Sequence, residues 1–188
     1  LNKTTTYTYA ENNTRLSTQN PAGNTWHYSY NDDGQLRTMT SPLGQVTSYT
    51  YEQGRVKTVT DPEGMVTTYG YDAAGRKISE HTPATGTTVF DYNERDQVVA
   101  VTDALGNRVE KRYDSRGNLL WEQDARGTVT EHDYDGNGNP IQITRAVGVF
   151  DVTTRFVYDG ADRLIETVDP LNHRQRRFSP PIGRPPHL

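Results

Sequence analysis

The stretch Val66-Thr67-Thr68-Tyr69-Gly70-Tyr71-Asp72-Ala73-Ala74-Gly75-Arg76-Lys77-Ile78 decides the fold of this chain. Tyr69 and Tyr71 are two residues apart and therefore point to the same face of an extended strand. Strict alternation of this kind favours a strand over a helix. Asp72 can accept hydrogen bonds from nearby backbone N–H groups, and Gly75 can adopt a positive φ without steric cost. The stretch therefore predicts a strand, a tight turn and a returning strand.

The same pattern recurs along the chain at a nearly fixed spacing. We call its strand-ending tyrosines the key tyrosines: Tyr9, Tyr30, Tyr51, Tyr71, Tyr92, Tyr113, Tyr134 and Tyr158. Their successive gaps are 21, 21, 20, 21, 21, 21 and 24 residues. An aromatic residue lies two positions before six of the eight, and Lys111 and His132 are the exceptions. Self-similarity at such a period indicates an array in which each repeat packs only against its neighbours.

A second turn closes each repeat about ten residues after the first. Proline presets φ at its second position, and glycine ends it. Examples are Asn20-Pro21-Ala22-Gly23, Ser41-Pro42-Leu43-Gly44, Asp61-Pro62-Glu63-Gly64, Asp103-Ala104-Leu105-Gly106 and Asp124-Ala125-Arg126-Gly127. We therefore expect an all-β array of antiparallel hairpins, about sixteen short strands, over residues 1–177. Residues 178–188 are proline-rich and are expected to form an irregular tail.

The composition fits a partly solvent-exposed β-sheet better than a domain with an ordinary globular core. Hydrophobic residues make up 32% of the 188 residues, below the usual share of nearly half. Tyrosine is abundant, at 12 residues, and favours pleated, partly exposed surfaces. The net charge is -4 and the charges are interspersed, which gives no basic footprint for nucleic acid. No apolar run is long enough to span a bilayer, and no signal peptide is recognisable at the first residues.

The segments Tyr71-Asp72-Ala73-Ala74-Gly75-Arg76, Tyr113-Asp114-Ser115-Arg116-Gly117-Asn118 and Tyr158-Asp159-Gly160-Ala161-Asp162-Arg163 resemble YD repeats. These repeats define the bacterial Rhs proteins, related insecticidal-toxin shell proteins and the animal teneurins. The resemblance covers residues 4–177 and favours the bacterial Rhs proteins. It implies a curved, spiralling sheet that forms part of an Rhs-type shell around a C-terminal toxin domain. The implied partners are the rest of the shell and the encapsulated toxin.

The resemblance also implies that the complete protein is a bacterial polymorphic toxin that is secreted or displayed at the cell surface. Eight repeats are too few to enclose a cavity. Asp169-Pro170-Leu171-Asn172 fits the second turn of a repeat and lacks the glycine-rich continuation of a self-cleaving segment. After residue 177 the pattern is lost near the place where a ninth tyrosine is due. We therefore expect the chain to be a truncated or frame-shifted fragment of a longer reading frame.

Two groups of residues suggest metal or acid–base chemistry and have simpler explanations. Asp133-x-Asp135-x-Asn137-Gly138 matches the first half of a calcium loop, but Thr144 stands where the loop needs a bidentate glutamate. The segment also lies where the repeat demands a turn. The histidines are His27, His81, His132, His173 and His187, and no pair has metal-ligand or base–nucleophile spacing. His132 occupies the aromatic slot before Tyr134, which favours a structural ring.

The repeated Tyr-Asp pairs do not predict catalysis, because an active site needs one asymmetric arrangement with shifted pKa values. The tyrosine is explained by packing on cross-strand neighbours. We therefore predict a non-catalytic chain with no catalytic, cofactor-binding or metal-binding residues and no cofactor.

Three further readings stay open at this point. Trp26 and Trp121 on a sheet face could stack against sugar rings, so a carbohydrate-binding adhesion module at the cell surface is the alternative function. The cluster His173-Arg174-Gln175-Arg176-Arg177 could contact an acidic partner or a membrane surface, or could be a solvated strand end. The isolated chain could also be a non-functional remnant, because open strand edges invite aggregation.

Overall fold

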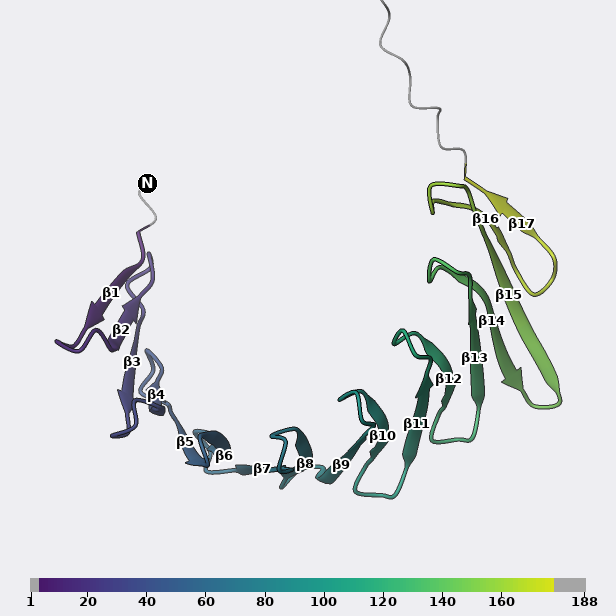
Figure 1. The fold of residues 1–188 in the computed structure, drawn as a ribbon. Helices are drawn as coiled ribbons and strands as arrows, with labels where there is room; N and C mark the ends of the chain where they lie inside the picture. The colour runs from purple at the N-terminus through teal and green to yellow at the C-terminus, as the bar shows by residue number, and fades with distance from the viewer. Residues whose placement is uncertain (1–3, 178–188) are drawn as a thin grey trace, which may run out of the picture. The chain divides into compact units, whose positions relative to one another are not determined.

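The described part of the chain folds as antiparallel β-structure. A computed structural model describes residues 4–177 and contains seventeen strands and no helix within this range. The all-β hairpin array expected from the sequence is therefore confirmed (Figure 1). The predicted tail at 178–188 lies outside the described residues. The described part of the chain accordingly has no helix of the length and apolar character that crossing a bilayer requires.

The contacts within the chain divide it into two compact units, Leu1–Phe90 and Asp91–Leu188. Within the first unit, strands that follow one another in the sequence pair with each other, from β1–β2 to β8–β9. Its strands are β1 (Thr6–Tyr9), β2 (Arg15–Gln19), β3 (Thr25–Tyr30), β4 (Leu36–Thr40), β5 (Val46–Glu52), β6 (Arg55–Thr60), β7 (Val66–Tyr71), β8 (Lys77–Thr82) and most of β9 (Gly86–Tyr92).

The second unit is also an antiparallel meander. Its strands are β10 (Val98–Thr102), β11 (Arg108–Tyr113), β12 (Leu119–Gln123), β13 (Val129–Tyr134), β14 (Pro140–Val147), β15 (Phe150–Tyr158), β16 (Leu164–Val168) and β17 (Arg174–Arg176). In both units the connections are short, so neighbours in sequence are neighbours in the sheet.

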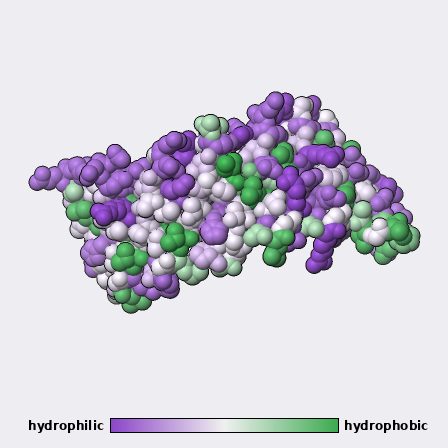
Figure 2. All heavy atoms as spheres, turned by 90° about the horizontal axis from the view of Figure 1, so that it is seen from below, coloured by the Kyte–Doolittle hydropathy of each residue, from purple (hydrophilic) through white to green (hydrophobic). Residues whose placement is uncertain are grey.

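Each unit is a single layer with almost no dry core. Among the described residues only Ala100, Val168 and Ser17 are buried, at 2%, 9% and 8% exposure. Along β3 the side chains alternate, with Trp26 half-buried and His27 exposed. On the face that Figure 2 shows, apolar side chains form small separate groups among polar ones. A one-layer sheet explains the low hydrophobic content, because neither face is covered by a second layer.

The predicted turns are confirmed at their hydrogen bonds. In the turn after β7, the N–H of Gly75 donates to the carbonyl of Asp72 (2.9 Å), and Gly75 has a φ of 87°. Four turns place another residue at the positive-φ position: Asn13, Asp96, Asp162 and Asn172. Asparagine and aspartate tolerate this conformation best after glycine. A glycine at the positive-φ position therefore predicts most, though not all, of these turns.

The hairpin β14–β15 departs from the pattern because it is longer than the others. Its strands have 8 and 9 residues and pair out to Val147 and Phe150. The neighbouring strand β13 reaches only Arg145 on β14. The three extra residues in the last gap between key tyrosines therefore extend one hairpin beyond its neighbours. Its tip is apolar and open to solvent, with Val149 at 91% and Phe150 at 75% exposure.

Candidate functional site

The key tyrosines connect each repeat to the one before it through their hydroxyl groups. Each of four hydroxyls donates a hydrogen bond to a backbone carbonyl fifteen residues earlier. The pairs are Tyr30 to Arg15 (2.9 Å), Tyr51 to Leu36 (2.8 Å), Tyr113 to Val98 (3.1 Å) and Tyr134 to Leu119 (3.0 Å). We call these the tyrosine bonds. Burial, and to a smaller degree the charge of Asp114, raise the pKa of Tyr134 above its ordinary value. The hydroxyl therefore stays protonated and remains a donor.

A β-bulge accompanies the carbonyl that three of the four tyrosine bonds use, those of Arg15, Leu36 and Leu119. Arg112 lies opposite Trp121, but the next residue, Tyr113, lies opposite Leu119, so Leu120 is an extra residue on β12. A bulge locally disrupts the ladder of backbone hydrogen bonds. The carbonyl of Leu119, beside this extra residue, accepts from Tyr134 of the next repeat. The same register shift occurs at Tyr9, Tyr30, Tyr51, Tyr71, Tyr134 and Tyr158.

Six of the eight turns that follow the key tyrosines are held by the side chain of their first residue, an aspartate or asparagine. In the turn after Tyr134, Asp135 accepts hydrogen bonds from the backbone N–H groups of Asn137 and Asn139, both at 2.9 Å. The side-chain amide of Asn139, and then its backbone N–H, hold the pKa of Asp135 below its ordinary value. The Asp135 carboxylate is therefore a structural acceptor within its own turn.

In the second unit these turns also contact one another. The guanidinium of Arg95 donates to the carbonyl of Ser115 in the next turn, and that of Arg116 donates to the carbonyl of Gly136 (2.5 Å). Asn137 continues the series with a 2.8 Å hydrogen bond to Asp162. The third residue of each turn thus reaches the following turn, and this edge of the second unit is linked by polar contacts.

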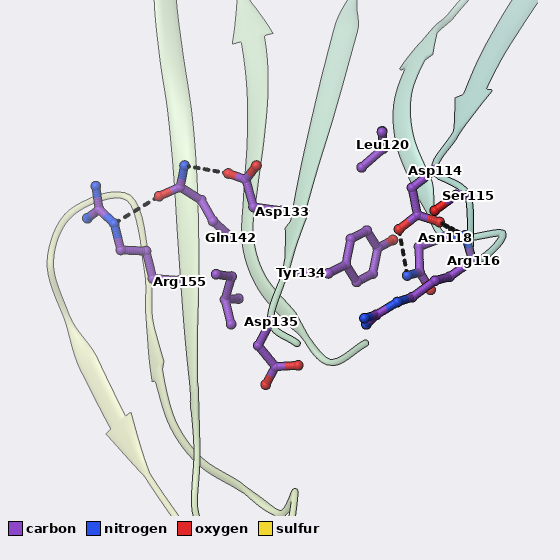
Figure 3. Close-up of a pocket in the computed structure, with 11 residues that line it drawn as sticks. Asp114, Ser115, Arg116, Asn118, Leu120, Asp133, Tyr134, Asp135, Gln142 and Arg155 are labelled. Atoms are coloured by element: carbon purple, nitrogen blue, oxygen red, sulfur yellow. Dashed lines mark hydrogen bonds between the residues drawn. The ribbon is translucent and has the colours of Figure 1, made fainter. Parts of the chain in front are cut away.

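An open groove with a volume of about 610 Å³ lies between two successive repeats of the second unit (Figure 3). One wall is the turn Asp114–Asn118, and the other is formed by Tyr134 and Asp135. On one side of this groove, Gln142 donates to Asp133 and accepts from Arg155, both at 3.2 Å. An equivalent groove of about 550 Å³ in the first unit lies between the turn that begins at Asn31 and the key tyrosine Tyr51. The groove is therefore a property of the repeat.

The polar side chains of the groove are engaged in structural hydrogen bonds. Its aspartates at the turns are occupied by backbone donors, and its arginines reach carbonyl or amide oxygens. Across residues 4–177, no three side chains of histidine, aspartate or glutamate are grouped so as to hold a metal ion. The arrangement holds repeats together and presents polar groups to solvent. The absence of catalytic, cofactor and metal residues stays a prediction from the sequence.

The residues of the calcium-like segment serve the fold. Asp135 caps its turn, and Asp133 pairs with Gln142 on the face away from the key tyrosines. Thr144, the residue in the twelfth position, lies on β14 and pairs with Thr153 across the strands (3.2 Å). This arrangement agrees with the turn interpretation.

The histidines are not brought together. His27 and His81 are exposed, and Nδ1 of His81 contacts the hydroxyl of Thr87 (2.9 Å). His132 is half-buried on β13, and its Nε2 has no hydrogen-bond partner among the described residues. His173 pairs with Asp169 in its own turn (2.8 Å). His187 lies outside the described residues.

The two tryptophans differ in their surroundings. Trp26 alternates with Tyr28 and Tyr30 and therefore lies on the key-tyrosine face of the first unit. Trp121 lies opposite Arg112 in the register, so it is on the face away from Tyr113 in the second unit. The guanidinium of Arg112 stands 4.3 Å from the centre of the Trp121 ring. One ring face of Trp121 is therefore already covered by a cation.

The tyrosine bonds and the bulges were missed by the sequence reasoning, although a signal for the bonds was present. The position two residues before the key tyrosine varies among tyrosine, phenylalanine, lysine and histidine. The key position is tyrosine in all eight repeats and never phenylalanine. Packing alone would accept either ring, so the invariance within this chain points to the hydroxyl group.

Comparison with protein families agrees with the repeat described above. A family model described as RHS Repeat matches residues 30–64, 52–88, 92–123 and 113–149, together more than half of the chain. The chain belongs to the RHS repeat family. The resemblance drawn from the YD segments is thus confirmed, and the tyrosine bonds are a feature of these RHS repeats. A search of curated proteins gives no match.

Solved structures with a similar fold are much longer than this RHS repeat chain. The crystal structure of TcdB2-TccC3-TEV matches with a TM-score of 0.66 at 14% identity, covering 87% of this chain and 11% of that chain. A Tc holotoxin pore from Photorhabdus luminescens matches at 17% identity over 89% of this chain and 13% of that chain, with a TM-score of 0.41. At such identities the likeness to TcdB2-TccC3-TEV concerns the fold alone.

Proposed function

We propose that this chain is a structural segment of an Rhs-type shell that encloses a C-terminal toxin domain of a secreted or surface-displayed bacterial protein. The observation that carries the proposal is the single-layer sheet of RHS repeats, in which only three described residues are buried. A globular domain needs a core covered from both sides. The wall of a shell is exposed to solvent on both faces, and the same is true of this sheet. The fold likeness to a segment of TcdB2-TccC3-TEV supports the same conclusion.

The proposed mechanism is containment without chemistry. Backbone ladders, tyrosine bonds and turn-to-turn contacts supply the strength of the wall. In the complete protein the sheet would wind into the curved, spiralling shell that the family resemblance implies. Its polar and aromatic surface would hold an enclosed domain without strong hydrophobic contact, because the apolar groups on the face shown in Figure 2 are small and separate.

The test uses the complete polypeptide that carries this chain. Limited proteolysis should leave a C-terminal domain intact while the wall is intact, and should degrade that domain after the wall is opened with denaturant. Gly75→Val should increase the degradation, whereas Phe150→Ser, at an exposed tip, should not. A polypeptide in which no segment is protected, or in which protection is unaffected by opening the wall, would overturn containment.

The carbohydrate-binding alternative predicts a different result. Saturable binding in a glycan screen that weakens with Trp26→Ala or Trp121→Ala would favour adhesion. Arg112 already covers one face of Trp121, and within residues 4–177 neither tryptophan stacks on a second aromatic ring. These observations make containment the better supported function.

A further inference from the structure

The turn after Tyr134 contains a pair of residues that favours a spontaneous chemical change. Asn137-Gly138 is the only asparagine–glycine pair in the 188 residues. Asparagine is among the chemically labile residues of proteins, because the backbone nitrogen of the next residue can attack its side-chain carbonyl carbon. Glycine hinders this attack least, since it has no Cβ atom and adopts many backbone conformations. The sequence of this turn therefore distinguishes it from every other turn of the array.

The structure exposes Asn137 to solvent but holds both reacting groups in hydrogen bonds. The side-chain amide of Asn137 donates to the carboxylate of Asp162 in the next turn (2.8 Å). The backbone N–H of Gly138 donates to the carbonyl of Asp135 (3.1 Å). The attack therefore requires both hydrogen bonds to open. Local opening of a surface turn costs much less free energy than global unfolding, so the folded chain can reach the reactive conformation.

The reaction needs water as its only other reactant. The backbone nitrogen of Gly138 loses its proton and forms a bond to Cγ of Asn137, and the side-chain nitrogen of Asn137 leaves as ammonia. The product is a cyclic imide. Water then opens this ring at one of its two carbonyl carbons. Opening at Cγ leaves an ordinary aspartate, whereas opening at the main-chain carbonyl leaves isoaspartate, in which the main chain runs through the side chain and is longer by one methylene group.

Either product breaks the contact between the two turns. A carboxylate at position 137 cannot donate to Asp162, and the two like charges repel each other. Isoaspartate lengthens the main chain inside a turn that the hydrogen bond from Gly138 to Asp135 closes. Asn139 donates to the same oxygen of Asp162 (2.8 Å). The repulsion therefore acts on the acceptor that both asparagines share, and it weakens the connection between these repeats.

We propose that Asn137 is a deamidation site that the contact with Asp162 protects, and that its reaction permanently loosens the polar edge of the second unit. The contact slows the reaction because the Asn137 amide must leave Asp162 before its carbon can be attacked. The contacts that Arg95 and Arg116 make between earlier turns involve no asparagine–glycine pair and survive. This inference is independent of the enclosure of a toxin, since it uses only contacts within the sheet.

The test incubates the folded chain at mildly alkaline pH, which favours deprotonation of the attacking nitrogen, and follows each asparagine by peptide mass spectrometry. Residue 137 should gain the mass expected when OH replaces NH₂, and an isoaspartyl methyltransferase should label the same peptide. Asn12 is the matched site within the chain, because it is also exposed and third in its turn but is followed by Asn13. It should react at least about tenfold more slowly than Asn137.

Variants test the protection by the neighbouring turn. Asp162→Gly removes the acceptor and suits the φ of 58° at this position, so it should raise the reaction rate at residue 137 severalfold. Asp96→Gly, at the equivalent position of an earlier turn, should leave that rate unchanged. Asn137→Asp should accelerate hydrogen exchange of the Gly138 amide as the reaction itself does. Circular dichroism would verify that each variant is folded.

Three results would each overturn the proposal. The first is a folded chain that gains no mass at residue 137 while the denatured chain does. The second is an equal reaction rate at Asn12 and Asn137. The third is an unchanged rate at residue 137 in Asp162→Gly, which would mean that the contact between the turns does not protect the asparagine.

Discussion

The hydroxyl of Tyr51 donates a 2.8 Å hydrogen bond to the carbonyl oxygen of Leu36, fifteen residues earlier in the chain. Leu36 lies opposite Tyr30, the key tyrosine of the preceding repeat, at a bulge in the ladder. The side chain of Tyr51 therefore joins the end of its own strand to the β-bulge of the preceding repeat, where the backbone ladder is irregular. This relationship explains why a ring alone is insufficient at the key position.

The first prediction concerns the loss of one tyrosine bond. Tyr134→Phe keeps the ring and removes the donor to the carbonyl of Leu119. It should lower the free energy of unfolding by about 1 kcal/mol, the usual net contribution of one hydrogen bond. Urea unfolding followed by circular dichroism measures this loss.

Tyr158→Phe is the matched control. Tyr158 follows the longest gap between key tyrosines, and its hydroxyl makes no tyrosine bond among the described residues. Its replacement should change the free energy of unfolding by less than about 0.5 kcal/mol. Equal losses for Tyr134→Phe and Tyr158→Phe would show that the ring, and not the hydroxyl bond, supplies the stability.

The second prediction compares two neighbours in one turn. Gly75 has a φ of 87°, which strains any residue that carries a Cβ atom, whereas the flexible end of the Arg55 side chain near that atom can move aside. Gly75→Val should therefore lower the free energy of unfolding by at least about 2 kcal/mol. Arg76→Ala removes a half-buried ion pair with Asp72 and should cost about 1 kcal/mol. Thermal unfolding of the two variants measures the difference.

Gly106→Val separates strain from crowding in that experiment. Gly106 has a φ of 83° and nothing within 4 Å of an added Cβ. Its replacement should cost about as much as Gly75→Val, because the strain at positive φ is the same, and more than Arg76→Ala. Equal thermal shifts for Gly75→Val and Arg76→Ala would contradict the turn geometry.

Strands and turns could be predicted because both are encoded locally. The alternation around Tyr71 sets the strand, and the spacing from Asp72 to Gly75 sets the turn, so no distant residue is needed. The structure reproduces both at the level of single hydrogen bonds. Family membership could be recognised for the same reason, since the repeat itself is the signature.

Contacts between repeats could not be predicted in the same way. The bulge that opposes Tyr113 to Leu119 depends on the register between two strands, which no single-strand pattern specifies. The contact from Arg116 to Gly136 depends on how far one turn lies from the next. For the exposed hairpin tip at Phe150, the sequence carries only one signal, the gap of 24 residues between the last two key tyrosines. That gap does not indicate which structure the extra residues form.

The third prediction concerns acid. Hydrogen bonds from the side chain of Asn118, and then from its backbone N–H, hold the pKa of Asp114 below its ordinary value. Hydrogen bonds from Asn139 lower the pKa of Asp135 in the same way. An unfolded aspartate has a pKa of about 3.9. The ionised aspartates therefore stabilise the folded chain fully above that pKa. Below it the aspartates of the unfolded chain are protonated while those of the folded chain are still ionised, so the stabilisation falls, and it is lost once the pH is below the folded pKa. The unfolding temperature should therefore be constant near neutral pH and drop below about pH 4.

Asp135→Asn tests the cause of this acid loss. Asn31 and Asn93 begin equivalent turns and accept backbone N–H groups through a neutral amide oxygen, at 2.8 Å and 2.9 Å. The variant should therefore fold and lose less stability between pH 5 and about pH 2 than the parent chain. Identical pH profiles for the two chains would mean that Asp135 does not contribute to the acid transition.

The fourth prediction addresses the contacts between turns. Arg116→Ala removes the 2.5 Å hydrogen bond to the carbonyl of Gly136. Because both groups are exposed, the global cost should be below about 1 kcal/mol. Hydrogen exchange of the backbone amides in the turn Asp135–Gly138 should nevertheless become faster. Arg126→Ala, in an exposed turn at the other end of the strands, should leave that exchange unchanged.

The fifth prediction distinguishes the exposed tip of β14–β15 from the few buried residues. Phe150 is 75% exposed, whereas Val168 is 9% exposed. Phe150→Ser should leave the free energy of unfolding within about 0.5 kcal/mol of the parent, and should raise solubility because an apolar group leaves the surface. Val168→Ala should cost roughly 1.5 kcal/mol, because it removes apolar surface that folding buries. Chemical unfolding and light scattering measure the two effects. A large loss of stability for Phe150→Ser would mean that the tip packs against the molecule, which would contradict its exposure.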